Sequence, residues 1–292
     1  MARITVVGSS NTDMVIKTEH FPLPGETIVG GEFFLFAGGK GANQAVAAAR
    51  LGGEVRFVAR VGNDVFGKQA LAGFEREGMD CSLVITDEET ASGTALITIN
   101  REGENSIVVA PGANARLSPE QLDTLTLQDG EYVLTQLETP LETVVAVSER
   151  GGRLVLNPAP AQPLPDSLLR RLYLITPNES ELALLTDTEV TGTAEVQRAA
   201  QALLNRGVRQ VVVTLGAAGA YYTDGRQAFM VSAPSVRAVD TTAAGDVFNG
   251  ALVVALSEGK DMREAIGFAI TAASLSVTRM GAQASAPYRH EL

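Results

Sequence analysis

The sequence predicts an α/β fold, a doubly wound and mostly parallel sheet with helices on both faces. Three observations support this prediction. Short runs rich in Val, Ile and Leu alternate with helical segments along most of the 292 residues, as in repeated β-α units. Most of these runs end in Gly, Pro, Asn or Glu, as expected for buried strands of a parallel sheet. Several helical segments end in glycine, which favours a helix C-terminus, so right-handed crossovers between parallel strands are expected.

The individual elements follow from the same patterns. Buried strands are expected at 3–8, 55–62, 132–137, 153–160, 172–179 and 210–216. Helices are expected at 40–52, 64–78, 139–151 and 194–207, and a further buried helix follows Asp246. The stretch "SPEQL" (118–122) has the spacing of a capping box.

Two regions interrupt the β-α order. Residues 13–36 and 93–110 alternate and turn like β-ribbons, and "REGEN" has the polar composition of a hairpin tip. We expect them to form a small sheet that stands off the main one, although two ordinary surface hairpins would give the same pattern. The apolar stretch "EFFLF" indicates that substrate or a partner subunit covers one face.

Composition excludes several classes of function. The net charge of −11 argues against nucleic acid or an anionic membrane as a partner. Cys81 is the single cysteine, so a disulfide framework is excluded, and the two histidines, His20 and His290, leave little for a zinc site or a catalytic triad. The apolar runs are too short to span a bilayer. The opening "MARITVVGSS" has no signal-peptide pattern, so a cytoplasmic protein is expected.

Polar and glycine-rich stretches follow the predicted strands, where open α/β sheets bind ligands. Asn11 and Asp13 lie in "GSSNTD", which we interpret as a loop, and alone they indicate a turn more than a site. "FAGGKGANQA" (36–45) is neither a Walker A motif nor a dinucleotide fingerprint. Its three glycines still permit a close backbone approach to a ligand at a helix N-terminus.

The later strand ends carry carboxylates and small residues. Glu138 follows one strand, and Asn178 with Glu181 follows another, either as a capping pair or as a Mg²⁺ site. "VTLGAAGA" (213–220) has the small residues that let backbone lie against a nucleotide. In "VDTTAAGDVFNG", Asp246 is either a helix-capping aspartate or a base beside the unpaired amides of residues 244–246. Together these parts suit phosphoryl transfer to a hydroxyl group.

The motifs occur in the order found in a known family. The sequence resembles the ribokinase (phosphofructokinase-B) family of sugar kinases through "GSSNTD", "PLPGET", "GGKGANQAVAAARLGG", "RVGNDVFG", "GENSIVVAPGANARLS", "QLETPLE", "LNPAPA", "ITPNESE", "VTLGAAGA", "VDTTAAGDVFNGAL" and "VTRMGAQAS". These motifs cover nearly all of residues 4–285, and "GGKGANQA" and "DTTAAGDVFNGA" are highly specific.

The resemblance implies ATP-dependent phosphorylation of the 5-hydroxyl of D-ribose, with Asp246 as general base. Backbone at Ala243, Ala244 and Gly245 would form the anion hole. The implied pentose contacts are Asn11, Thr12, Asp13, Gly39, Lys40, Gly41, Ala42, Asn43, Glu138 and Asp246. The implied nucleotide contacts are Asn178, Thr214, Leu215, Gly216, Ala217, Ala218, Gly219, Gly245 and Ile270.

The resemblance also implies metal sites. Asn178 and Glu181 would serve Mg²⁺ and the phosphates. A monovalent cation, K⁺, would bind beside the anion hole at Asp240, Thr242, Ser276, Arg279, Gly281 and Ser285.

The implied architecture is a single domain of residues 1–292 whose lid, about 13–36 and 93–110, closes over the sugar and pairs with a second subunit as a homodimer. Ile270 stands where the family often has a polar side chain near adenine, which leaves the nucleotide preference open. The acceptor is also open between ribose, 2-deoxyribose and another pentose. A nucleoside kinase and a catalytically silent sugar-binding protein are the remaining alternatives.

Overall fold

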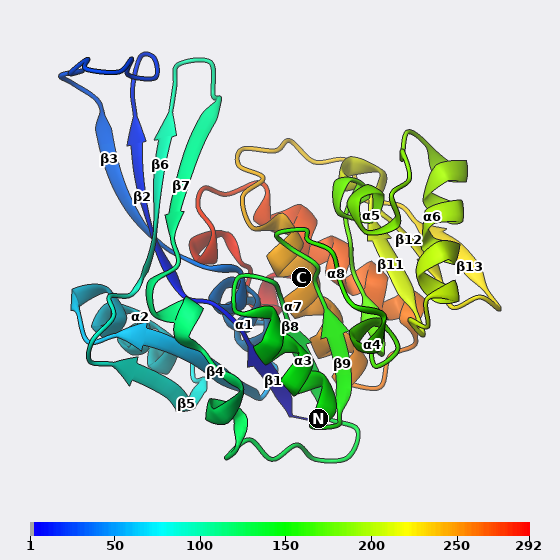
Figure 1. The fold of residues 1–292 in the computed structure, drawn as a ribbon. Coiled ribbons are helices and arrows are strands. Elements are labelled where there is room, and N and C mark those ends of the chain that lie inside the picture. Colours follow the sequence, from blue (N-terminus) through cyan, green and yellow to red (C-terminus); the bar gives the residue numbers. More distant parts are fainter. Residues whose placement is uncertain (1–2) are drawn as a thin grey trace.

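A computed structural model describes residues 3–292 and shows the predicted α/β architecture, with a nine-stranded main sheet in the order β13-β12-β11-β10-β9-β8-β1-β4-β5 (Figure 1). The strands from β11 to β5 are parallel, and β12 and β13 pair antiparallel at one edge. Within residues 3–292, no helix is long and apolar enough to cross a membrane.

The main-sheet strands are short and apolar. Their bounds are β1 Ile4–Val7, β4 Val55–Gly62, β5 Asp80–Asp87, β8 Tyr132–Thr135, β9 Arg153–Leu156, β10 Leu174–Ile175, β11 Val211–Thr214, β12 Ala220–Thr223 and β13 Ala228–Val231. The helices are α1 Lys40–Arg50, α2 Val65–Arg76, α3 Leu141–Glu149, α4 Asp166–Leu169, α5 Glu179–Thr186, α6 Thr193–Asn205, α7 Ala244–Ser257 and α8 Met262–Ser276.

A hydrophobic core covers each face of the main sheet. Alternate residues of β1 point to opposite cores, Ile4 and Val6 to one and Val7 to the other, as the pleat requires. Helices α1, α2, α7 and α8 supply the first core, and α3 to α6 supply the second. This double cover explains why the strand sequences are mostly apolar.

A second, four-stranded sheet stands away from the main one (Figure 1). Its order is β3-β2-β6-β7, with bounds β2 Asn11–Lys17, β3 Glu32–Gly38, β6 Gly93–Ile99 and β7 Asn105–Ala110. We call it the small sheet. Large apolar side chains lie exposed on it, among them Phe33 at 60% and Val108 at 64%. The two predicted β-ribbons therefore pair with each other, β2 with β6, instead of forming separate hairpins.

Every strand and helix predicted from the sequence is present, usually shorter by one or two residues at each end. The largest difference is the segment 172–179, which holds only the two residues of β10 before the chain turns into α5. The predicted capping box at Ser118 and Gln121 is present at the start of a short 3₁₀ helix, Pro119–Leu122. The sequence patterns did not single out β5, β12, β13, α4 or α8, and of α5 they indicated only the first turn.

Candidate active site

The start of α7 presents open backbone amides. Ala243 is the N-cap and takes up a left-handed conformation, with φ 59° and ψ 12°. The amide of Ala244 donates to the carbonyl of Thr241 at 3.3 Å, which corrects the expectation of three free amides. Within residues 3–292, the amides of Gly245 and Asp246 donate to no backbone carbonyl before the helix and to no side chain. Two adjacent N–H groups at a helix N-terminus form an anion site.

Asp246 lies at the third position of this helix and is 6% exposed. Its Oδ2 accepts a hydrogen bond from Nδ2 of Asn43, and its Oδ1 accepts one from Nε2 of Gln44, both at 2.9 Å. The carboxyl group makes no capping bond to its own helix. The structure therefore favours the site interpretation of Asp246 over the capping one.

Burial dominates the electrostatics of Asp246. Burial raises the pKa of this carboxyl, while Lys40 and the hydrogen bonds from Gln44 and Asn43 act against the rise. The nearby Glu138 carboxylate raises the pKa further. A carboxylate with a raised pKa, held by two amide donors, is suited to take a proton from a bound hydroxyl.

The start of α1 contrasts with that of α7. The amide of Lys40 donates to Oε2 of Glu138 at 2.9 Å, and the amide of Gly41 donates to Oγ of Ser9 at 3.2 Å. The amide of Ala42 donates to the carbonyl of Ser9 at 2.8 Å. The chain thus satisfies this helix start itself, and the glycine-rich stretch forms no anion site there in this conformation.

The glycines of this stretch let α1 lie directly against the end of β1. A Cβ added to Gly41 would meet the amide nitrogen of Ser9 and stand 2.7 Å from Cα of Gly8. A Cβ added to Gly8 would stand 2.7 Å from Cα of Gly41. Real Cβ atoms do not approach backbone so closely, so both positions require glycine.

The predicted sugar contacts gather in front of this helix start. Asn11 and Asp13 belong to β2 and not to a loop, because β2 continues the chain from β1 into the small sheet. Burial and the carboxylates of Glu138 and Asp246 raise the pKa of Asp13 to about 6. Lys40 acts against this rise, so these three acidic groups and Lys40 share one electrostatic environment.

Two polar side chains here, Asn43 and Asn11, have groups that could bind a polar ligand. Oδ1 of Asn43 is buried and has no hydrogen-bond partner within residues 3–292. Asn11 offers its amide group, since its Oδ1 already accepts a bond from Nδ2 of Asn114 at 2.7 Å. Buried unpaired acceptors are costly, and a ligand hydroxyl would supply the donor that Asn43 lacks.

Asn178 and Glu181 form the capping box that starts α5. Oδ1 of Asn178 accepts from the amide of Glu181 at 2.8 Å, and Oε2 of Glu181 accepts from the amide of Asn178 at 2.9 Å. Burial raises the pKa of Glu181, while the amide of Asn178 and the charge of Lys40 act against this rise. The capping interpretation is confirmed. The carboxylate oxygens of Glu181 keep further lone pairs that a hydrated cation could use.

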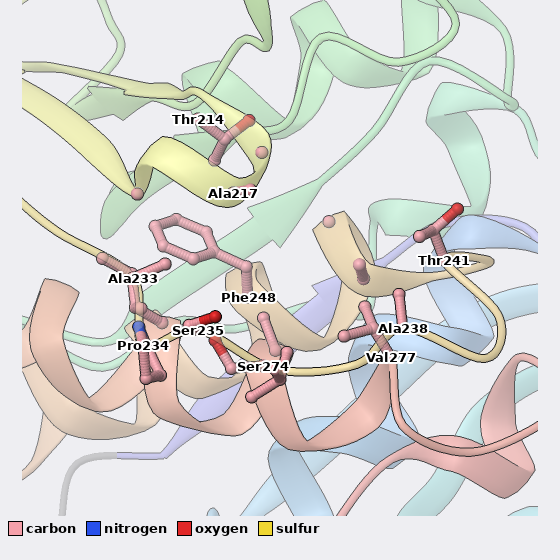
Figure 2. A pocket seen from close by; sticks show the side chains of 17 residues that line it. Thr214, Ala217, Ala233, Pro234, Ser235, Ala238, Thr241, Phe248, Ser274 and Val277 are labelled. Atoms are coloured by element: carbon pink, nitrogen blue, oxygen red, sulfur yellow. The ribbon is translucent and has the colours of Figure 1, made fainter.

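The predicted nucleotide contacts converge on one pocket of about 430 Å³ between β11, α7 and α8. Thr214, Gly216, Ala217, Gly219, Gly245 and Ile270 line it, whereas Asn178, Leu215 and Ala218 do not. Figure 2 shows Phe248 of α7 between the loop that carries Thr214 and Ala217 and the segment from Ala233 to Ser235. The pocket includes Ala244 and Gly245, so it opens onto the start of α7.

Of the predicted cation ligands, Asp240 and Thr242 precede the start of α7, and Gly281 is hydrogen-bonded to Asp240. The carboxylate of Asp240 accepts from the amides of Thr242 and Gly281, both at 2.9 Å, which joins two loops distant in sequence. Although burial acts to raise it, these hydrogen bonds hold the pKa of Asp240 below its usual range. Within residues 3–292, no three His, Cys, Asp or Glu residues cluster as a metal site. Any ion here would rely on backbone carbonyls beside Asp240.

Sequence reasoning missed a set of buried amide and hydroxyl side chains behind Asp246. These residues are Gln44, Gln136, Asn157, Thr176 and Asn249. Their signal in the sequence is a polar residue inside an otherwise apolar segment, as Gln44 in "NQAVAAA" and Asn249 in "VFNGALVV". A polar side chain in such a place needs a buried partner.

Comparisons with known proteins agree over the whole chain. The profile of the pfkB family carbohydrate kinases matches residues 1–289. The ribokinase of Haemophilus influenzae is 44% identical, over 99% of this chain and 96% of that protein. A deoxyribokinase of Salmonella typhimurium is 37% identical, over 97% of this chain and 95% of its own.

Two solved structures extend the agreement to the fold. A ribokinase from Thermotoga maritima has a TM-score of 0.92 and 42% identity, covering 100% of this chain and 98% of its own. A ribokinase from Arabidopsis thaliana, complexed with ribose and ATP, has a TM-score of 0.90 and 34% identity, covering 99% and 96%.

Proposed function

Because the chain belongs to the pfkB family of carbohydrate kinases, we propose that it transfers the γ-phosphoryl group of ATP to the 5-hydroxyl of D-ribose. The single observation that carries this proposal is the buried carboxylate of Asp246 beside the open amides of Gly245 and Asp246, at the mouth of an apolar pocket. Its closely similar relatives include a ribokinase, and a ribokinase of the same fold is complexed with ribose and ATP.

The proposal gives each part of the site a role in the reaction. Asp246 takes the proton of the 5-hydroxyl as the hydroxyl oxygen bonds to the γ-phosphorus, while the bond from that phosphorus to the bridging oxygen breaks and ADP leaves. Such proton transfer contributes roughly 10²–10⁴ in rate. The amides at the start of α7 bind the charge on the transferring group, and one such donor is worth about 3 kcal/mol. Lys40, which lowers the pKa of Asp246 through its charge, stands near enough to offset negative charge in the same space.

The sugar binds between α1 and the small sheet. Asn43 accepts from one hydroxyl through its unpaired Oδ1, and Asn11 and Asp13 approach from β2. Glu138 retains lone pairs beyond those used by Ser9 and Lys40. Thr12, Gly39, Gly41 and Ala42 shape the same site through backbone and contact surface.

Two metal ions complete the chemistry. Mg²⁺, bound with the phosphates of ATP, would be held through Asn178 and Glu181, whose carboxylate oxygens keep lone pairs beyond the capping bonds. K⁺ would lie near Asp240, Thr242, Ser276, Arg279, Gly281 and Ser285, where the Asp240 carboxylate already joins two loops. These ions would neutralise charge on the phosphates and fix the geometry of the two loops that Asp240 joins.

The small sheet acts as a lid and as an association surface. Its exposed apolar side chains include Phe33, Leu96, Ile107 and Val108, a patch of the kind that protein partners cover. A second copy of the chain, paired through this sheet, would cover it and form a homodimer in the cytoplasm. Sedimentation at several protein concentrations tests the pairing, and a chain that stays monomeric throughout would contradict it.

A coupled assay of ADP release tests the function. It compares ribose, 2-deoxyribose, fructose and adenosine as acceptors, with and without Mg²⁺, and with K⁺ or Na⁺ as the only monovalent cation. We expect the largest kcat/KM with ribose, Mg²⁺ and K⁺. The deoxyribokinase relative makes 2-deoxyribose the second candidate acceptor. Sugar binding by calorimetry without ADP release would contradict a catalytic role.

A further inference from the structure

The base and the anion site are joined by a closed set of buried hydrogen bonds. Nε2 of Gln44 donates to Oδ1 of Asp246 and to Oδ1 of Asn157, both at 2.9 Å. Nδ2 of Asn157 donates to the carbonyl of Thr176 at 3.3 Å, and the Thr176 hydroxyl donates to Oδ1 of Asn249 at 2.6 Å.

The set closes on the helix that carries the base. Nδ2 of Asn249 donates to the carbonyl of Gly245 at 2.8 Å. That carbonyl belongs to the peptide whose N–H is the open amide of Asp246. We call Gln44, Asn157, Thr176 and Asn249 the buried ring, which the Gly245–Asp246 peptide completes. The ring spans α1, α7 and the ends of β9 and β10.

Each member is fixed in orientation and shielded from water. All four side chains are at most 7% exposed. Gln44 uses both N–H groups in the ring, and its Oε1 accepts from Nε2 of Gln136 at 2.6 Å. A flipped Gln44 would place its oxygen against the Asp246 carboxylate, so only one orientation satisfies every bond.

We propose that the buried ring is a positioning device, in which Gln44 aims the Asp246 carboxylate and Asn249 holds the Gly245–Asp246 peptide, so that base and anion site keep one fixed geometry. This inference rests on the proposed sugar-kinase function. None of the four residues lines the pocket or is itself one of the predicted sugar contacts, so they act through Asp246 and the peptide. Small misplacements at such a site cost about a hundredfold in rate.

The first test is Gln44→Met, which keeps the length of the side chain and removes its donors. We expect kcat to fall about tenfold or more while KM for ribose and for ATP stays within about twofold. Since Gln44 stabilises the ionised carboxylate, its loss also moves the acidic limb of the kcat–pH profile to higher pH. The other charged groups that face Asp246 are Lys40, Glu138, Asp13 and Glu181, and the substitution leaves them in place.

The second test separates positioning from stability. Thr176→Val removes the hydroxyl that donates to Oδ1 of Asn249. Thr143→Val is the matched control, because it removes an equally buried hydroxyl that donates to the carbonyl of Leu117, outside the ring. We expect both variants to lower the melting temperature, but only Thr176→Val to lower kcat, by about tenfold. Thr176→Ser keeps the hydroxyl and should restore kcat.

The outcomes are distinct. Unchanged kcat and pH profile in Gln44→Met, or equal kcat in the two valine variants, would overturn the positioning role while the wild-type activity stands. A wild-type chain that releases no ADP with any sugar would contradict the proposed function and this inference with it. Should Gln44→Met fail to fold, the threonine series alone decides.

Discussion

Helices α1 and α7 both begin at a run of small residues near the same carboxylates, yet the first amides of α1 are hydrogen-bonded and two of the first amides of α7 are not. Those of α1 are taken up by Glu138 and Ser9 of the same chain, whereas the amides of Gly245 and Asp246 in α7 stay open. A satisfied helix start is a rigid support, and an unsatisfied one is a binding site. Under the proposed function, α1 would support the sugar side of the site and α7 would bind the transferring phosphoryl group.

The largest expected effect tests the α7 side. Asp246→Asn keeps the shape of the side chain but removes the proton acceptor, so kcat should fall about a thousandfold with KM for ribose within a few-fold. Steady-state ADP release measures both. Asp261→Asn is the matched control, because Asp261 only caps α8 through the amide of Glu264. It should leave kcat unchanged, and a rate within a few-fold of wild type for Asp246→Asn would remove the role assigned to the base.

The next effect tests the α1 side. Gly41→Ala forces a methyl group against Ser9 and Gly8, so the free energy of unfolding should fall by about 3 kcal/mol and KM for ribose should rise as α1 shifts. Urea denaturation and sugar titration measure the two effects. A stable variant with wild-type KM would show that the α1 start does not support the sugar site.

Gly245→Ala reverses this pattern. A Cβ at Gly245 meets no atom within 4 Å, so the free energy of unfolding should stay equal or rise by up to about 1 kcal/mol. The methyl group would project beside the open amides, however, and kcat should fall about a hundredfold. Gly267→Ala in α8 is the control, because its Cβ also meets nothing within 4 Å and Gly267 lies away from the pocket lining. Equal kcat in both variants would contradict an anion site at α7.

The smallest effect concerns pH. Asp13 has its pKa raised to about 6 by burial, Glu138 and Asp246, so it loses its charge, and its capacity to accept two sugar hydroxyls, as pH falls through about 6. We expect kcat/KM for ribose to decline by up to about tenfold per unit below this value. Asp13→Asn should lower kcat/KM at neutral pH and flatten that limb. If the acidic limb of the kcat/KM profile is unchanged in Asp13→Asn, that limb reports the titration of Asp246 instead.

Much of the fold was predictable because strand burial and helix ends depend on patterns of neighbouring residues in the sequence. The strand β4 has the predicted bounds, and Asp246 and Glu138 stand out from their own sequence patterns, whereas Asn43 is indicated only by the family resemblance. The difference between the two helix starts was not predictable, because the acceptors for α1 come from Ser9 and Glu138, 31 and 98 residues from Lys40 in the chain. The buried ring was missed for the same reason, since Gln44 and Asp246 are 202 residues apart.

Asn178 and Glu181 show that one residue spacing can suit two roles. Their spacing suits both a helix cap and a metal site, and the structure shows the cap. The capped carboxylate is also partly buried with a raised pKa. Local geometry therefore confirms one role without excluding the other, because a carboxylate oxygen that accepts a backbone amide can still accept from a hydrated ion.

The contact between Gly8 and Gly41 bears on how this sequence can diverge. Each glycine occupies the space that a side chain on the other would need, and the Gln136 side chain closes the remaining room at Gly8. A larger residue at either position therefore destabilises the fold, whichever residue stands at the other position. A double substitution cannot be reached through a single substitution of normal stability. We expect both glycines to persist in descendants of this chain long after the surrounding surface residues have drifted.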